Sequence, residues 1–252
     1  MTVSRHPVIV FDLDGTLLPG TTASLVIAEA MGRRAAVEES ERLYRNGEIS
    51  MYEFTAREAA LFAGTRPEQL GDHLRGAPWI GGLRETFAAL TGAGCILLLA
   101  TLAWRFVTEA MEYRPWFAAV SGAEMDLEGS ILSGATFRHF DEKDKLRFVE
   151  CWCKAHGYQL ADVAAIGDSQ SDIPLFHKVG TAIALNATSD ARAAADHVLD
   201  TADLRDILPL LQMRGDGGAG FATGTPRRPE GGGLGQRPSL QPTVPSRPLT
   251  QR

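Results

Sequence analysis

Short runs of apolar residues, each ended by turn-forming residues, alternate along the chain with stretches in which apolar positions recur at helical spacing. Runs of this length are typical of buried parallel strands, and amphipathic stretches between them are typical of crossover helices. The pattern therefore predicts an α/β fold with a doubly wound, Rossmann-like parallel sheet. The expected strands are residues 8–11, 95–100, 117–121, 163–166, 181–185 and 197–199, and the clearest expected helices are 82–90, 142–155 and 204–212.

The interval from Pro19 to Pro78 interrupts this alternation. A crossover between parallel strands needs only about a dozen residues, whereas this interval has about 60 and its patterns are helical. Ser50 and Glu53 have the spacing of a capping box ahead of an apolar helical pattern, and Pro67 suits the first turn of another helix. The interval is therefore expected to be an inserted, all-helical cap domain that closes over the site.

The expected domain boundaries follow from these two patterns and from the composition of the C-terminal segment. From Met213 onward the chain is rich in Gly, Pro and Arg, and such a segment buries too little apolar surface to offset the entropy lost on ordering. The expected divisions are a core domain over 1–18 and 79–212, a cap domain over 19–78 and a disordered tail over 213–252.

Composition narrows the classes of function. The 252 residues carry a formal net charge of −6, which disfavours nucleic-acid binding because such domains usually have a basic face. Three cysteines without disulfide or metal-ligand spacing indicate reduced thiols. The first residues lack the apolar core of a signal peptide, and the longest apolar run, 95–100, is too short to span a bilayer. We expect a cytoplasmic protein with small-molecule ligands and no nucleic-acid or membrane partner.

Two carboxylates end the first expected strand, in the segment VIVFDLDGT at residues 8–16. Asp12 and Asp14 are two residues apart, so in an extended chain their side chains point the same way. Like charges this close raise each other's pKa unless a cation lies between them, and carboxylate oxygens are the ligands that Mg²⁺ prefers. The sequence therefore predicts a magnesium site at the carboxyl end of the sheet, where open α/β folds bind their ligands.

Further polar residues follow later strands. Thr101 ends the second strand, Lys143 or Lys145 opens a helix, and Asp168 and Asp172 lie in the turn after the fourth strand. A carboxylate can attack phosphorus, a lysine and a metal can neutralise the transferring group, and a hydroxyl can hold its oxygens. Each residue alone is explained as well by a turn, a strand end, an exposed charge or a helix cap. Their joint occurrence at converging strand ends favours phosphoryl transfer.

In this order, over residues 7–212, these motifs resemble those of the haloacid dehalogenase superfamily of phosphohydrolases. The resemblance implies that Asp12 is the nucleophile that forms an aspartyl-phosphate, and that Asp14 is the general acid and base. It further implies Thr101 as the phosphate-binding hydroxyl, Lys143 as the cation that faces the phosphate, Asp168 as a Mg²⁺ ligand with Asp12 and the Asp14 carbonyl, and Asp172 as a supporting carboxylate. Lys145 is the alternative to Lys143, because sequence spacing separates the two poorly.

The helical insert and the segment GDSQSDIPLF at 167–176 look most like the phosphoserine phosphatase branch of that superfamily. Three departures concern the substrate pocket. Thr21 and Thr22 stand where that branch has a glutamate for the substrate's amino group, and Leu102 stands where it has a glycine. The arginine that holds the substrate's carboxylate there aligns with Ala59, and Arg57 lies half a helical turn away.

The resemblance thus implies a Mg²⁺-dependent phosphomonoester hydrolase that acts on a small phosphorylated metabolite other than phosphoserine. The candidate substrate-facing residues are Thr21, Thr22, Arg57, Leu102, Phe62 and Trp104, although packing or exposure explains the aromatic residues and the arginine at least as well. Two alternatives stay open at this point. One is a phosphotransferase or mutase of the same superfamily, and the other is a binding module that senses a phosphorylated metabolite without turning it over.

Overall fold

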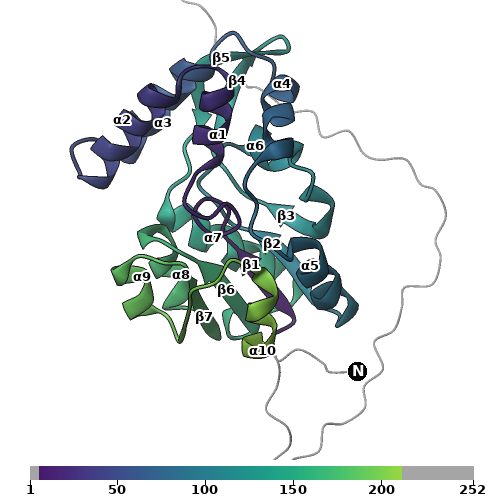
Figure 1. Ribbon diagram of the computed structural model, residues 1–252. Helices are drawn as coiled ribbons and strands as arrows, with labels where there is room; N and C mark the ends of the chain where they lie inside the picture. Colours follow the sequence, from purple (N-terminus) through teal and green to yellow (C-terminus); the bar gives the residue numbers. More distant parts are fainter. Residues whose placement is uncertain (1–5, 212–252) are drawn as a thin grey trace, which may run out of the picture. The chain divides into compact units, whose positions relative to one another are not determined.

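The computed structural model describes residues 6–211, and their centre is a parallel sheet of six strands (Figure 1). The strands lie in the order β3-β2-β1-β6-β7-β8, so the first strand of the chain lies inside the sheet. The bounds are β1 Val8–Phe11, β2 Ile96–Leu99, β3 Phe117–Val120, β6 Val163–Gly167, β7 Thr181–Leu185 and β8 His197–Leu199. The predicted α/β fold is confirmed. The tail expected over 213–252 lies outside the described residues.

Alternate residues of β1 pack on opposite faces of the sheet. Ile9 and Phe11 join a core cluster with residues of α5 and of the C-terminal helices, whereas Val8 and Val10 join a second cluster with residues of α7, α8 and α9. All four residues of β1 are buried, as a strand covered on both faces requires. The covering elements are α5 Leu83–Gly92, α7 Glu142–His156, α8 Ile173–Phe176, α9 Ser189–Ala194, η5 Leu204–Ile207 and α10 Leu208–Leu211.

The long interval after β1 is helical, as its patterns predict. Its elements are α1 Ala23–Ala30, α2 Arg34–Arg45, α3 Met51–Phe62, α4 Pro67–Asp72 and the short 3-10 helix η1 His73–Gly76. Ser50 and Glu53 form the expected capping box at the start of α3, and Pro67 occupies the first turn of α4. These helices lie in the upper half of Figure 1, and the sheet with α5, α8 and α9 lies in the lower half.

A two-stranded antiparallel hairpin, β4 Glu124–Glu128 and β5 Ile131–Arg138, joins this helical group. The Gly64 N–H donates to the Leu132 carbonyl and the Leu132 N–H donates to the Thr65 carbonyl, both at 2.9 Å. Gly134 has φ of +85°, and a Cβ there would lie 2.8 Å from the Ala63 Cβ. The hairpin therefore packs directly against the end of α3, and a sequence segment far from the helical interval contributes to this part of the fold.

The other short elements connect the sheet to its surroundings. They are α6 Arg105–Ala110, η2 Arg114–Trp116, η3 Leu160–Asp162 and η4 Gln170–Asp172. Among the described residues, every helix is too short or too polar to span a bilayer.

Candidate active site

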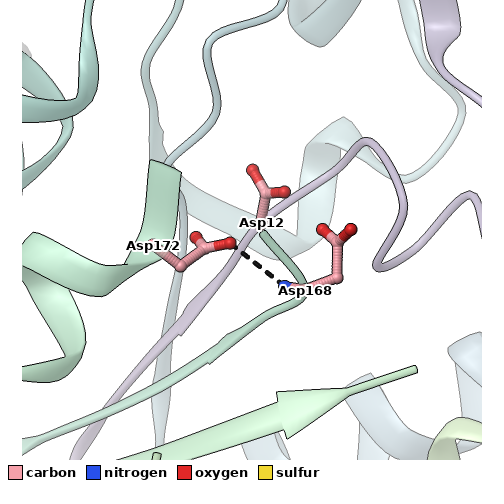
Figure 2. Close-up of side chains that lie close together, drawn as sticks. All are labelled: Asp12, Asp168 and Asp172. Atoms are coloured by element: carbon pink, nitrogen blue, oxygen red, sulfur yellow. Dashed lines mark hydrogen bonds between the residues drawn. The ribbon is translucent and has the colours of Figure 1, made fainter. Parts of the chain in front are cut away.

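Three carboxylates that are distant in sequence meet at the carboxyl ends of two neighbouring strands (Figure 2). Asp12 follows β1, Asp168 follows β6, and Asp172 lies in η4 just beyond it. One oxygen from each carboxylate lies within 4.8 Å of the others. β1 and β6 pair in register, Phe11 with Ile166, which brings the residues after them together. The convergence predicted for Asp12 and Asp168 is therefore present.

The lysine at this cluster is Lys145, and the choice of Lys143 is wrong. The Lys145 Nζ donates to the Asp12 Oδ1 at 2.8 Å and to the Asp172 Oδ1 at 2.5 Å, and the side chain is fully buried. Lys143 is exposed. Asp141 caps α7 by accepting the N–H groups of Lys143 and Asp144, and this start places the fourth helical residue, rather than the second, on the face toward the sheet.

Asp172 is buried and holds its neighbours in the cluster through hydrogen bonds. Its Oδ2 accepts the Asp168 N–H at 3.0 Å, the bond drawn in Figure 2, and the Ser169 N–H at 3.2 Å, while its Oδ1 takes the ammonium of Lys145. Gly167 has no side chain, and a Cβ there would lie 2.2 Å from the Asp172 carboxyl carbon. Asp172 thus fixes both the lysine and the turn that carries Asp168, which is the geometry of a supporting carboxylate.

Burial and the neighbouring charges set the ionisation of Asp12 and Lys145. Burial raises the pKa of Asp12 to about 6, against the lowering effect of the Lys145 charge. Burial alone would lower the pKa of Lys145, but the Asp12 and Asp172 carboxylates outweigh it and raise that pKa. Asp12 therefore remains a carboxylate beside an ammonium group at neutral pH, as a carboxylate nucleophile requires.

Asp14 stands apart from the three clustered carboxylates. Its Oδ1 accepts the Ala23 N–H at 2.7 Å, which ties it to the start of α1. Burial is the main cause that raises its pKa to about 7, and the Asp12 charge adds to it. A carboxyl group that titrates near neutral pH can both give and take a proton there.

Asp168 has the donor chemistry and the surroundings of a cation ligand. Burial is the main cause that raises its pKa to about 8, and the charges of Asp12 and Asp172 add to it. The Thr16 hydroxyl, at 3.1 Å, and the Lys145 charge lower the pKa by less. Gly15 has φ of +79°, and a Cβ there would lie 2.2 Å from the Asp168 Oδ2. An acidic cluster that burial drives toward protonation is stabilised by a divalent cation, so these residues fit the magnesium site that the sequence predicts.

The end of β3 holds Thr101 in place. The Ser121 Oγ accepts the Thr101 N–H at 2.8 Å and donates to the Thr101 carbonyl at 3.0 Å. The Thr101 hydroxyl in turn accepts the Ala103 N–H at 3.1 Å. Thr101 is 1% exposed yet lines the cavity described next. Ser121 has no distinctive sequence signal, and its role emerges only from the pairing of β2 with β3.

A cavity of about 450 Å³ opens over these residues. Asp12, Asp14, Thr101 and Asp168 line it together with residues of the helical interval. Of the candidates for substrate contact, Thr21, Thr22 and Leu102 also line it. Its lining residues contributed by α2 and α3 are Glu41, Tyr44, Arg45, Met51, Phe54 and Glu58.

Arg57 does not line this cavity, and its proposed substrate contact is wrong. The side chain is exposed on α3, whereas the next residue, Glu58, is buried and lines the cavity. One residue along a helix turns the side chain by about 100°, which carries Arg57 to the outer face. Phe62 is completely buried in the core cluster, and Trp104 is buried with its indole N–H donating to the Glu58 Oε2 at 3.1 Å.

Two acidic cavity residues, Glu41 and Glu58, have no motif that would have singled them out in the sequence. Glu41 lies in a run of charged residues typical of an exposed helix face, and Glu58 follows a charged residue in an amphipathic helix. Thr16 belongs to the DLDGT segment, but its bond to Asp168 depends on the fold.

Comparisons with known proteins add evidence on the family that does not depend on this geometry. The sequence model of the haloacid dehalogenase-like hydrolase family matches residues 9–177. The chain is 27% identical over 206 residues to phosphoserine phosphatase SerB2 of Mycobacterium tuberculosis, covering 81% of this chain and 50% of that protein. It is 25% identical over 219 residues to a phosphoserine phosphatase of Albidiferax ferrireducens, covering 84% of this chain and 92% of the relative. The chain thus spans half the length of the mycobacterial protein.

Solved structures share the fold. A substrate-bound phosphoserine phosphatase superposes with a TM-score of 0.72 at 21% identity, covering 82% of this chain and 98% of that one. A phosphoserine phosphatase carrying an analogue of a phospho-aspartyl intermediate superposes with a TM-score of 0.71 at 21% identity, covering 84% of this chain and all of that one.

Proposed function

Because the chain belongs to the haloacid dehalogenase-like hydrolases, we propose that it hydrolyses small phosphomonoesters through an aspartyl-phosphate on Asp12. Its curated relatives are phosphoserine phosphatases, and the chain is a phosphatase. The observation that carries the proposal is the ion pair of Asp12, which lines the cavity, with the fully buried Lys145, because it supplies an ionised nucleophile beside a fixed positive charge.

In the first step an oxygen of Asp12 attacks phosphorus, and the bond from phosphorus to the leaving oxygen breaks. Asp14 gives its proton to that oxygen, so the alcohol leaves neutral. In the second step a water attacks the phosphorus of the aspartyl-phosphate, Asp14 takes the water's proton, and the Asp12 carboxylate is released with inorganic phosphate. The pKa of Asp14, raised to about 7, suits both proton transfers.

The charge on the transferring group needs fixed positive partners and donors. Lys145 supplies one charge, and the Thr101 hydroxyl lines the same cavity and can hold a phosphate oxygen. Asp12, Asp168 and the Asp14 carbonyl are the proposed Mg²⁺ ligands, with Asp172 holding Lys145 and the turn of Asp168. When bound there, Mg²⁺ would neutralise the acidic cluster and the phosphate oxygens.

The helical interval is proposed to act as the cap, and it includes the β4–β5 hairpin. Two contacts support this role. Residues of α2 and α3 form part of the cavity lining, and the Tyr44 hydroxyl donates to the Glu142 Oε1 at 2.6 Å, which joins α2 to the first residue of α7. Closure of these helices would exclude water other than the one that attacks the intermediate.

The decisive experiment compares wild-type protein, Asp12→Asn and Asp126→Asn with p-nitrophenyl phosphate and Mg²⁺. Asp126 is an exposed residue of β4 and serves as the matched control. We expect Asp12→Asn to lower turnover by about 10³-fold or more, because the amide keeps the shape and loses the nucleophile, and Asp126→Asn to leave it unchanged. Rapid quenching with labelled substrate should trap acid-stable phosphate on the wild-type protein and on Asp126→Asn, but not on Asp12→Asn.

Chelation of divalent cations should abolish both turnover and the trapped phosphate. Full turnover by Asp12→Asn, or a labelled protein that forms equally well without Asp12, would falsify the proposal. Release of inorganic phosphate from a single substrate, with no acceptor alcohol added, distinguishes hydrolysis from phosphoryl transfer to another substrate.

A further inference from the structure

The side of the cavity away from Asp12 carries two acidic residues that the proposed chemistry leaves without a role. Glu41 on α2 and Glu58 on α3 both line it. Arg45 is the single basic residue among the described residues that line the cavity, and its side chain is exposed. A phosphate bound near Asp12 would therefore present its leaving group to a lining whose partly or fully buried charged groups on α2 and α3 are the two glutamates.

Glu58 is a buried carboxyl group with one unused oxygen. The residue is 5% exposed, and the Trp104 indole N–H donates to its Oε2 at 3.1 Å. Its Oε1 is buried and takes part in no hydrogen bond of good geometry within residues 6–211, although the Ser24 hydroxyl lies close enough to lower the pKa of Glu58. Burial of an unpaired carboxyl oxygen is costly, so a residue placed in this way beside a cavity calls for a partner from the ligand.

The charges and the burial around Glu58 indicate which kind of ligand group it would bind. Burial is the main cause that raises its pKa to about 8; the charges of Glu41 and Asp14 add to the effect, and the Ser24 hydroxyl and the Trp104 indole oppose it. A positive group placed against it would offset these causes, as Lys145 does for Asp12. A ligand carboxylate would meet the same acidic groups and would add to the repulsion.

Glu41 is held in position by the start of α1. Its Oε1 accepts the Thr22 hydroxyl at 2.7 Å, and the Thr22 Oγ accepts the Leu25 N–H as the cap of that helix. Burial raises the pKa of Glu41 as well. Thr22 thus does not bind the substrate with a free hydroxyl proton, because that proton is already given to Glu41. The acidic side chain next to Thr22 is therefore Glu41 of α2.

We propose that Glu58, supported by Glu41, selects phosphomonoesters whose leaving group carries an amine and lacks a carboxylate, of which an amino-alcohol monophosphate is the simplest. This inference rests on the proposed function and adds the substrate class to it. The amine would donate to the Glu58 Oε1 while the phosphate lies at Asp12. The outward direction of Arg57 leaves the cavity without a buried cation for a substrate carboxylate.

Four substrates that differ in one group each test the proposal. They are 2-aminoethyl phosphate, 2-hydroxyethyl phosphate, O-phosphoserine and phosphoglycolate, assayed by phosphate release beside p-nitrophenyl phosphate. We expect kcat/KM of the wild-type protein to be highest for 2-aminoethyl phosphate. For 2-hydroxyethyl phosphate, whose leaving group is uncharged, kcat/KM should be about 10-fold or more lower, since a hydrogen bond between charged groups is lost. It should be lower still for both esters that carry a carboxylate.

Variants assign the preference to the two glutamates. Glu58→Gln should lower kcat/KM for 2-aminoethyl phosphate by about 10-fold or more, should leave 2-hydroxyethyl phosphate within about 3-fold, and should so erase the preference. Glu41→Gln should also reduce the preference for 2-aminoethyl phosphate over 2-hydroxyethyl phosphate. Because Glu41 is only partly buried, this variant provides a test even if Glu58→Gln does not fold. Glu68→Gln is the matched control, because Glu68 is an exposed carboxylate of α4 outside the cavity.

The outcomes separate this inference from the proposed function. Hydrolysis of p-nitrophenyl phosphate that depends on Asp12, combined with O-phosphoserine or phosphoglycolate as the preferred substrate, overturns the inference and leaves the hydrolase assignment standing. The inference is equally wrong if Glu58→Gln or Glu41→Gln slows all four esters by the same factor. Turnover of p-nitrophenyl phosphate that persists in Asp12→Asn overturns the proposed function itself.

Discussion

Lys145 is the residue on which the charge of the site depends. It is fully buried between Asp12 and Asp172, and both carboxylates would face each other without it. Removal of one partner from a buried ion pair costs about 3–5 kcal/mol, because it leaves an uncompensated charge. The same removal takes the positive charge from the position where we propose the phosphoryl group to bind.

We therefore predict that Lys145→Met lowers turnover of p-nitrophenyl phosphate by about 10²-fold or more and lowers the melting temperature. Lys143→Met, two residues earlier on the same helix, should change neither quantity, because Lys143 is exposed. Steady-state kinetics and thermal unfolding of the two variants provide the measurement. Equal loss of activity in both would contradict the assignment of the lysine.

For single residues, the sequence indicates which residue types form the site better than it indicates the helix face on which each side chain lies. Asp12 and Asp168 were found because they directly follow apolar strands, whose ends must converge in a doubly wound sheet. The error between Lys143 and Lys145 and the error between Arg57 and Glu58 have a common cause. Both pairs lie on helices, where a displacement of one or two residues changes the face, and the rotation of a helix about its axis is set by tertiary packing.

At the scale of elements, one hydrogen bond joins the helical interval to the helix that carries the lysine. The Tyr44 hydroxyl on α2 donates to the Glu142 Oε1 at the start of α7 at 2.6 Å. The Tyr44 ring also lies against Phe54 of α3, with 5.3 Å between the ring centroids. A phenylalanine at this position keeps the ring contact and loses only the bond between the two elements.

We predict that Tyr44→Phe raises KM for small phosphomonoesters by about 3- to 10-fold, the equivalent of one hydrogen bond, with a smaller change in kcat. The closed arrangement of α2 over the cavity would be less populated, and the variant would need more substrate to reach it. Tyr52→Phe is the control, because Tyr52 on α3 is 61% exposed. A decrease of kcat alone, at constant KM, would argue against a role of this bond in closure.

The hairpin is the element that sequence patterns failed to predict as strands. β4 and β5 pair with two shifts in register, and seven of their thirteen residues are exposed, so strict alternation of apolar and polar residues is absent. Its glycines indicate turns only. By contrast, the six strands of the sheet and the helices after β1 were predicted, because their apolar periods are regular and their caps have distinct sequence signals.

At the scale of the whole molecule, buried carboxyl groups make folding depend on pH. The pKa of Glu58 is raised to about 8, above its ordinary value of 4.5, chiefly by burial, with Glu41 and Asp14 as the charges that face it. Between these two values the folded state binds more protons than the unfolded state. The stability that the protonated group contributes is therefore present at low pH and is lost as pH rises through about 8.

We predict that the free energy of unfolding of the wild-type protein falls relative to that of Glu58→Gln as pH rises from about 5 to about 8, by up to about 1.4 kcal/mol per pH unit. Urea unfolding of both proteins at the two pH values measures this difference. The other raised groups, among them Asp168, are common to both proteins and cancel. A difference that does not change with pH would mean that Glu58 is charged throughout.

Because β1 lies inside the sheet, Asp12 is anchored more firmly than the cavity residues on the helices outside the sheet. β1 is hydrogen-bonded to β2 on one side and to β6 on the other, so opening of the outer strands leaves Asp12 anchored. Glu41 and Glu58 belong to helices outside that sheet. If Asp12 is the nucleophile as proposed, substitutions in those helices would change the preferred leaving alcohol while Asp12 stays in place, so this chain is a practical starting point for altering specificity by mutagenesis.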